Sequence, residues 1–126
     1  MAGTVADYVV ILDVHTDLKA SAGIDDKTFP FTLPSTAAVA TQHSILSLMV
    51  HSMGAANNLK ANVSINGVKV WGYGPTNADL TRPFHEVLKT SENALKPGNN
   101  TLKIQVEGGQ GTFRVSDIVI WFQNNV

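Results

Sequence analysis

The sequence contains no cysteine, so neither disulfides nor thiolate metal sites can form, and packing and hydrogen bonds must hold the fold together. Charge is also scarce, because charged residues make up 15% of the chain, against roughly 25% in typical soluble domains. The formal net charge is −1, and no cluster of Lys or Arg occurs. Since phosphate contacts dominate nucleic-acid affinity, we expect no nucleic-acid partner.

Long apolar runs are missing as well. Runs such as Val9 to Leu12 are far too short to cross a bilayer, and residues 1–7 lack the basic and apolar regions of a secretory signal. We therefore expect a soluble domain with no membrane partner and leave its compartment open. A chain of 126 residues suits one hydrophobic core, so we predict a single domain over residues 1–126, with residues 1–6 flexible.

What the sequence does have is an alternation of apolar and polar residues, which is typical of antiparallel strands with one face in water. The second half of the chain shows this pattern most clearly, in the runs 44–53, 59–65, 101–107 and 113–122. A strand is also predicted at 8–15, and its start should be buried on both faces. Two prolines in 28–34 confine that strand to a sheet edge, and 16–27 reads as a loop.

Residues that tolerate a positive φ separate these runs. Asn66-Gly67 is the strongest signal, because both central residues of a type I′ turn need a positive φ, and it predicts a hairpin before Val68. Gly54–Asn58 and Gly108–Gly111 are predicted to close two more hairpins, and 72–79 to form a loop. Strands at this spacing predict an all-β fold, an antiparallel β-sandwich or jelly roll of about eight to nine strands.

A family resemblance rests on three segments, 61–70 with its Asn-Gly hairpin, 82–87, and 95–106 with its Lys-Pro-Gly-Asn-Asn approach to a strand. They resemble the galactose-binding-like jelly rolls, the sugar-binding and accessory β-sandwiches of many glycoside hydrolases. The resemblance covers roughly residues 44–122, and its residues serve the fold: Gly67 and Gly98 as turns, and Leu95, Leu102 and Ile104 in the core. It implies an often non-catalytic domain that binds ligands on end loops or a concave face, sometimes beside a structural calcium.

The most chemically varied part of the sequence is the segment 71–85. Carbohydrate sites combine an aromatic face that stacks on C–H groups with amides, carboxylates and guanidinium groups that bond hydroxyls. This segment supplies all of these types, and its candidate ligand-binding residues are Trp71, Tyr73, Asn77, Asp79, Arg82 and His85. The alternative is that Trp71 packs beneath the loop and Arg82 pairs with Asp79 at the surface.

Metal ligands are sparse in the sequence. His43 and His51 lie about 26 Å apart on one extended strand, too far to share an ion, and no His-x-His motif occurs. We therefore expect no cofactor and no histidine metal site. Calcium is a weaker alternative for the acidic residues Asp17, Asp25 and Asp26, although they lack the spacing of an EF-hand loop.

Catalytic patterns are equally sparse. Ser52 lacks the preceding glycine and the strand-turn-helix context of a nucleophile elbow. The carboxylates Asp79, Glu86 and Glu92 have no pattern that marks an acid and base pair, and Gly108–Gly111 precedes a strand rather than a phosphate-binding helix. We therefore expect that the chain is not an enzyme.

Two functions follow from these observations. The first is a non-catalytic, lectin-like module that binds carbohydrate through the segment 71–85. The second is a structural or assembly protein, such as a virion or appendage subunit, that oligomerises through apolar sheet faces. The second draws on the last strand, where Ile118, Ile120 and Phe122 oppose Val119 and Trp121, so that both faces are apolar. Such a strand is either central and covered on both sides, or meets another copy of the chain.

Overall fold

The computed structural model describes residues 3–20 and 25–126, and most of them lie in antiparallel strands. The short 3-10 helix η2 (Thr90–Glu92) lies between the last two strands. The strands are β1 (Thr4–Leu12), β2 (Thr16–Lys19), β3 (Asp25–Leu33), β4 (Ser44–Ile65), β5 (Val68–Thr76), β6 (Leu80–Leu88) and β7 (Gly98–Asn125). The prediction of an all-β antiparallel sandwich is confirmed.

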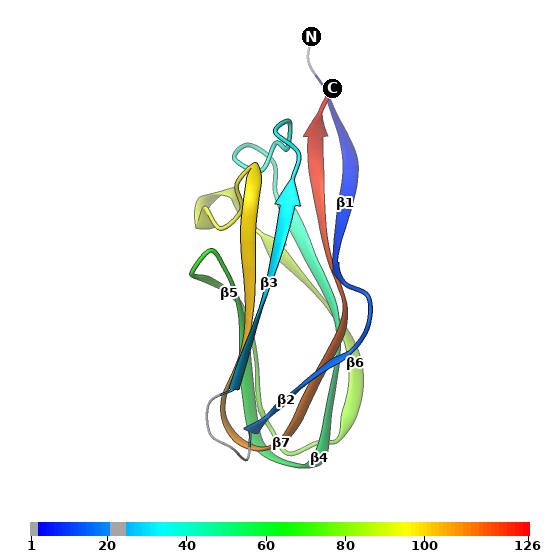
Figure 1. The fold of residues 1–126 in the computed structure, drawn as a ribbon, viewed down its shortest axis with the longest axis vertical. Coiled ribbons are helices and arrows are strands. Elements are labelled where there is room, and N and C mark those ends of the chain that lie inside the picture. The colour runs from blue at the N-terminus through cyan, green and yellow to red at the C-terminus, as the bar shows by residue number, and fades with distance from the viewer. Residues whose placement is uncertain (1–2, 21–24) are drawn as a thin grey trace.

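The strands form two layers (Figure 1). In one layer, β3 pairs with the first part of β7, which pairs with the second part of β4, and β5 completes the edge. In the other layer, β1 and β2 pair with the second part of β7, which pairs with the first part of β4, and β6 completes the edge. Hydrogen bonding links both layers into one sheet of seven strands in the described residues, because β4 and β7 belong to both layers.

The passage between layers occurs at a bend in each long strand. In β4 the bend contains Gly54, Ala55 and Asn58 at positive φ, and in β7 it contains Gly109 and Gly111. The pairing register shifts on both sides of Asn57, which lies opposite Gln110. The two hairpins predicted at these places are wrong: the halves of each strand pair with the other long strand rather than with each other. Residues that tolerate positive φ allow a bend as well as a turn, so the sequence does not separate the two.

Other boundaries also differ from the predictions. The segment 72–79 is a loop only at 77–79, because β5 continues along the edge of its layer and pairs Leu59 with Thr76. In the predicted loop 16–27, β2 occupies 16–19 and β3 begins at 25, while 21–24 lie outside the described residues. β1 starts at Thr4, opposite Asn125, so residues 4–6, expected to be flexible, pair with β7.

The hairpin at Asn66-Gly67 is confirmed, with φ of 51° and 83° and with Ile65 paired to Val68. Asn66 also connects two distant segments, because its Nδ2 donates to the Ala94 carbonyl and to Asn100 Oδ1, both at 2.8 Å. Asn100 is buried and accepts the Lys96 N–H as well. These bonds fix the entry to β7 against the β4–β5 turn, so the motifs behind the family resemblance serve the fold.

The core lies between the two layers and consists of the inward-facing residues of the strands. Along β4, burial alternates with exposure, as the pleat of a strand requires, with Leu46, Leu48 and Val50 facing inward. β7 contributes Leu102, Ile104, Phe113, Val115, Ile118 and Ile120, all fully buried. Each such side chain contributes about 1.5–3 kcal/mol when removed from water. In the described residues, no helix is long and apolar enough to span a membrane.

The bends can be tested with two neighbouring glycines. Gly109 has a φ of 86°, and a Cβ there would clash with the Asn58 carbonyl oxygen on the bend of β4. Gly109→Ala should therefore lower the free energy of unfolding by more than about 2 kcal/mol, because a left-handed residue alone costs about 1–2 kcal/mol. Gly108→Ala is the control, since nothing lies within 4 Å of its Cβ position. Urea unfolding that shows equal effects of the two variants would contradict this packing of the bends.

Candidate functional site

The six predicted site residues lie along the side of the sandwich where the two layers have their edges. Trp71 and Tyr73 belong to β5, Arg82 and His85 to β6, and Asn77 and Asp79 to the connection between them. Because β5 and β6 are edge strands of different layers, this connection crosses from one layer to the other. The structure does not gather the six side chains at one place.

Trp71 and Tyr73 lie inside the sandwich. Each is 8% exposed, and both rings pack against Phe84 of β6 and Phe113 of β7, with centroids 5.0–6.4 Å apart. Offset and tilted aromatic pairs at such distances add about 0.5–1.5 kcal/mol each beyond burial. The four rings therefore close the core between the edge strands, and Trp71 has no open ring face on which a sugar could stack.

The polar groups of the connection bond to the fold. Asn77 Oδ1 accepts the Asn58 N–H at 2.8 Å, and Asp79 Oδ1 accepts the Ala56 N–H at 3.2 Å, so both side chains satisfy backbone donors at the bend of β4. The Tyr73 hydroxyl donates to Ser52 Oγ at 3.0 Å, and that hydroxyl donates to the Ala78 carbonyl at 2.6 Å. The alternative pairing of Arg82 with Asp79 is absent from the described part of the chain.

A groove runs between β5 and β6 above the aromatic cluster. Its volume is about 290 Å³, and its lining includes Tyr73, Leu80, Arg82 and Phe84 and the backbone at Gly72 and Gly74. Of the six predicted residues, Tyr73 and Arg82 line it. Arg82 is exposed and is the one charged residue of the lining within residues 3–20 and 25–126.

His85 lies on the opposite side of β6, on a surface that we name the Trp121 face. Two rows of outward-facing residues form this face. Each row crosses the strands β1, β7, β4 and β6 in that order and takes one residue from each strand. Neither row contains Asp, Glu, Lys or Arg. The rows are Tyr8, Trp121, Ile45 and Val87, and beside them Val10, Val119, Ser47 and His85.

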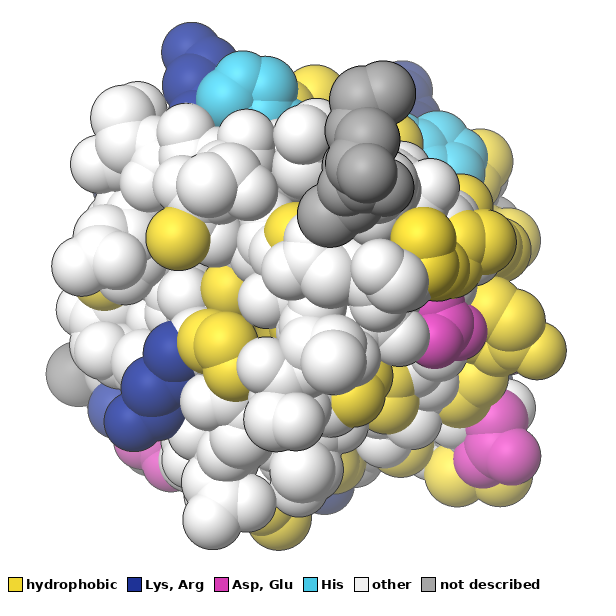
Figure 2. Space-filling model, turned by 90° about the horizontal axis from the view of Figure 1, so that it is seen from above, with side chains coloured by type: hydrophobic (Ala, Val, Ile, Leu, Met, Phe, Trp, Pro, Cys, Tyr) yellow, Lys and Arg dark blue, Asp and Glu magenta, His cyan; other side chains and the backbone are white. Residues whose placement is uncertain are grey.

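Trp121 is tied to the neighbouring strand on this face. Its Nε1–H donates to Ser47 Oγ on β4 at 2.7 Å, which holds the indole across the sheet, and the side chain is still 45% exposed. Tyr8, 57% exposed, packs beside it with ring centroids 5.2 Å apart and planes tilted by 39°. Seen from above, hydrophobic side chains gather on the right-hand side of the molecule (Figure 2), where Figure 1 places β1. The indole is thus held on the sheet while nearly half of the residue stays open to solvent.

Sequence reasoning missed Tyr8 and Val10 as surface residues, because we expected the start of the first strand to be buried on both faces. Val9 and Ile11 alternate with them and pack against the core, so both faces of β1 are apolar and periodicity does not say which is covered. Trp121 was recognised only as part of a strand that is apolar on both faces. The signal lies in the pairing of Tyr8 with Trp121 and of Trp121 with Ile45, which joins segments far apart in the sequence.

The acidic residues considered for calcium have other partners. Arg114 donates to both carboxylate oxygens of Asp17, at 2.7 and 3.1 Å, and these hydrogen bonds hold the pKa of Asp17 below its ordinary value. Asp25 Oδ2 accepts the Lys19 N–H, and Asp26 pairs with Lys103. Across residues 3–20 and 25–126, no group of three or more His, Asp or Glu side chains could hold a metal ion.

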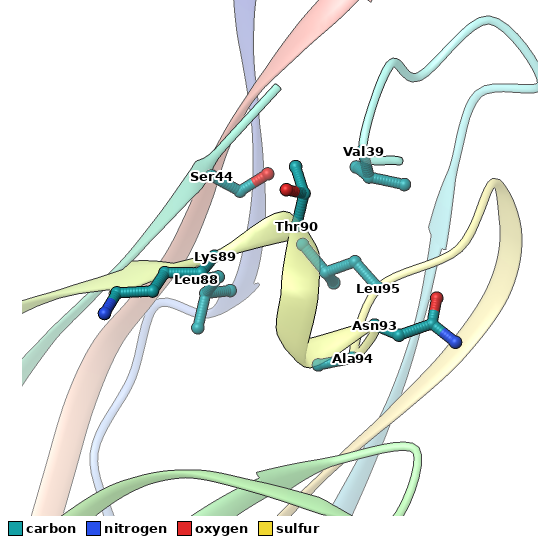
Figure 3. Close-up of a pocket in the computed structure, with 8 residues that line it drawn as sticks. All are labelled: Val39, Ser44, Leu88, Lys89, Thr90, Asn93, Ala94 and Leu95. Atoms are coloured by element: carbon teal, nitrogen blue, oxygen red, sulfur yellow. The ribbon is translucent and has the colours of Figure 1, made fainter. Parts of the chain in front are cut away.

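The residues considered for catalysis also have structural roles. Ser52 is fully buried, and Glu92 Oε1 accepts the Lys89 N–H at the start of η2. A second cavity lies beside η2, where side chains from the end of β6, from η2 and from the segment before β4 meet (Figure 3). Its volume of about 10 Å³ admits one water molecule and no larger ligand.

The sequence matches no family model and no curated protein. Solved structures share its fold. A β-porphyranase of glycoside hydrolase family 86 from the human gut bacterium Bacteroides plebeius is 20% identical over 99% of this chain, with a TM-score of 0.66. Dimeric latent PorU from Porphyromonas gingivalis is 10% identical over 96% of this chain, with a TM-score of 0.65. A protein of the T13 IBDV viral particle is 16% identical over 96% of this chain, with a TM-score of 0.53.

The chain shares a β-sandwich fold with the matching parts of these proteins. It spans 21% of the porphyranase chain, 13% of the PorU chain and 31% of the viral chain. At these identities the likeness concerns the fold. The resemblance noted in the sequence is therefore confirmed at that level.

The two tryptophans should respond differently to truncation. Trp71→Ala removes a buried ring from the aromatic cluster and should lower the free energy of unfolding by about 3–5 kcal/mol. Trp121→Ala removes a half-exposed ring and one hydrogen bond, so the loss should be about 1 kcal/mol or less. Urea unfolding followed by circular dichroism measures both. Equal losses would show that the assignment of one ring to the core and one to the surface is incorrect.

The ion pair between Asp17 and Arg114 predicts a pH dependence. Because the folded chain lowers the pKa of Asp17 from its ordinary 3.8, the pair stabilises the fold above that pH, and the contribution disappears as the pH falls through the folded-state value. Asp17→Asn should therefore reduce the urea midpoint near neutral pH and leave it unchanged in strong acid. The side chains of Asp17 and Arg114 are 30% and 33% exposed, so the reduction should be small. A difference that grows in acid would contradict this.

Proposed function

We propose that the chain is a non-catalytic carbohydrate-binding β-sandwich that holds sugar on the Trp121 face. The observation that carries the proposal is the half-exposed Trp121 indole, which the hydrogen bond to Ser47 ties to the neighbouring strand. The C–H faces of sugar rings pack on such aromatic faces, and polar groups beside the ring bond the hydroxyls. Ser47, His85 and the Tyr8 hydroxyl, on the same rows as the indole, supply polar groups for the second role.

The dimensions of the face agree with a saccharide of several units. The row from Tyr8 to Val87 crosses four strands, and three strand spacings correspond to about 14 Å. Ile45 and Val87 extend the apolar surface of the Trp121 face beyond the indole, and both are more than 40% exposed. Since the rows carry no Asp, Glu, Lys or Arg, binding of a neutral saccharide there requires no buried charge.

The proposal changes the roles of the residues in the segment 71–85. Trp121 takes the stacking role that the sequence suggested for Trp71. His85 keeps its place as a ligand on the Trp121 face. Asn77 and Asp79 act through the fold, because they hold the bend of β4. The similar domain of a β-porphyranase, a glycoside hydrolase, supports the proposal, since a β-sandwich of this shape occurs within a carbohydrate-active enzyme.

A second function draws on the aliphatic part of the same face. Val10, Ile45 and Val87 are 47%, 41% and 49% exposed, and exposed apolar patches rimmed by polar residues also occur where subunits meet. In that case the chain is an assembly protein, and the occupant of the Trp121 face is another copy of the chain. The fold shared with a viral particle protein is compatible with this alternative.

One experiment separates the two functions. The purified chain is applied to an array of glycans and polysaccharides, and its mass in solution is measured by light scattering. We expect a monomer that binds a subset of saccharides, with binding reduced at least about tenfold in Trp121→Ala, by analogy with the stacking of nucleic-acid bases on aromatic side chains, which is worth about 1–3 kcal/mol. Val14→Ser, which removes an apolar side chain that is 65% exposed outside the two rows, should bind as the wild type does.

Two outcomes would reject carbohydrate binding at this face. The first is an oligomer that Trp121→Ala dissociates and that retains no saccharide, which would favour the assembly function. The second is saccharide binding that Trp121→Ala leaves intact, which would place the ligand elsewhere on the molecule. The unfolding measurements on Trp121→Ala ensure that a loss of binding does not reflect a loss of fold.

A further inference from the structure

Arg82 stands on the inward side of β6. Its register partner on β4 is Val50, which is fully buried, and residues directly opposite in an antiparallel pair point to the same side of the sheet. Phe84, two residues along, faces the same way and belongs to the aromatic cluster. The Arg82 side chain thus leaves β6 on its inward side, and it lines the groove between β5 and β6.

This guanidinium has no carboxylate partner in the part of the chain that the structure describes. Asp79, the acidic residue nearest in sequence, accepts the Ala56 N–H. Glu86 faces the same side of β6 but lies four residues away, about 13 Å along the strand. The remaining lining of the groove is aromatic, aliphatic, hydroxyl or backbone. A guanidinium without a carboxylate partner beside such a groove favours an anionic ligand, because charge-assisted hydrogen bonds are stronger than neutral ones.

An inward-pointing charge on an edge strand can also protect that edge from pairing with other chains. That role requires only a charge on the strand. It does not require a groove beside the guanidinium, nor an aromatic ring two residues away that faces the same space. The structure contains both, so the side chain and the groove together resemble a site for a small ligand with one charged end.

We propose that the groove between β5 and β6 binds an acidic sugar residue, whose carboxylate or sulfate group pairs with the Arg82 guanidinium. The planar guanidinium donates two parallel hydrogen bonds to such a group, and the sugar ring lies against Phe84 and the edge of Tyr73. A volume of about 290 Å³ is at the lower end of ligand sites, which suits one sugar residue rather than a long chain. In taking the ligand to be a saccharide, the inference rests on the proposed function, and it adds a charge-selective site separate from the Trp121 face.

The test uses the full chain in an NMR titration that follows the backbone amides. The probes are glucuronate, glucose 6-sulfate, uncharged glucose and inorganic sulfate. We expect both acidic sugars to shift the amides of Gly72, Gly74 and Phe84, and glucose to do so at least about tenfold more weakly, the difference that a charge-assisted hydrogen bond makes. Arg82→Gln should remove this preference, and Arg82→Lys should keep part of it, since lysine retains the charge without the paired donors.

The control variant is Lys103→Gln, which makes the same change of charge on β7, where Lys103 pairs with Asp26. It should bind the acidic sugars as the wild type does. An Arg82→Gln variant that is folded and binds with unchanged affinity would overturn the inference. So would glucose binding as tightly as glucuronate, or inorganic sulfate binding alone as tightly as the sugars, which would show a site for free anions.

The Trp121→Ala variant keeps this inference apart from the proposed function. It should retain the shifts at Gly72, Gly74 and Phe84, because the Trp121 face lies on the outer side of its layer and the groove on the inner side. Loss of array binding with these shifts intact supports two separate sites. Loss of both together in a folded variant would overturn the separate groove site while leaving the Trp121 face as the place of binding.

Discussion

The structure depends on the pairing of β4 with β7 through both layers of the sandwich. Each strand bends where the other bends, with Asn57 opposite Gln110, so neither bend could be kept if the other were straight. Gly109 and Gly111 permit the close approach, because their missing Cβ atoms would meet the backbone of β4. This shared bend places β5 and β6 as edges of different layers on one side of the molecule. The aromatic cluster and the groove above it exist because of that placement.

The chain contains few charged residues, and several of its polar side chains hydrogen-bond to the backbone and stabilise the fold. Asn77 and Asp79 hold the bend of β4, and Asn66 and Asn100 fix the entry to β7. These residues have the chemistry of ligand-binding groups, yet the backbone donors and acceptors of a bent sheet take up their hydrogen bonds. Two features in the described part of the chain carry the proposals instead, the uncharged aromatic surface around Trp121 and the Arg82 guanidinium beside the groove. Neither is a cluster of functional groups that sequence spacing could reveal.

The sequence predicted the fold class because alternation reports directly on which residues of a strand face the core. It also predicted the Asn66-Gly67 turn and the edge position of β3, whose pairing is with β7. It could not distinguish bends from hairpins at Gly54–Asn58 and Gly108–Gly111, since both need residues that accept positive φ. Nor could it tell which tryptophan is buried. Trp71 and Trp121 both lie in strands with apolar neighbours, and their exposure follows from long-range register.

The central pairing also has a kinetic meaning. Ile45 and Trp121 are register partners, although most of the chain separates them in the sequence, and the same holds for Tyr8 and Trp121. Closing such long loops costs entropy before any contact is gained, which makes sandwiches of this kind slow to fold, in milliseconds to seconds. Until β7 pairs with β4, the apolar residues of both strands are exposed to solvent. The time the nascent chain spends in that state sets its exposure to self-association in the cell.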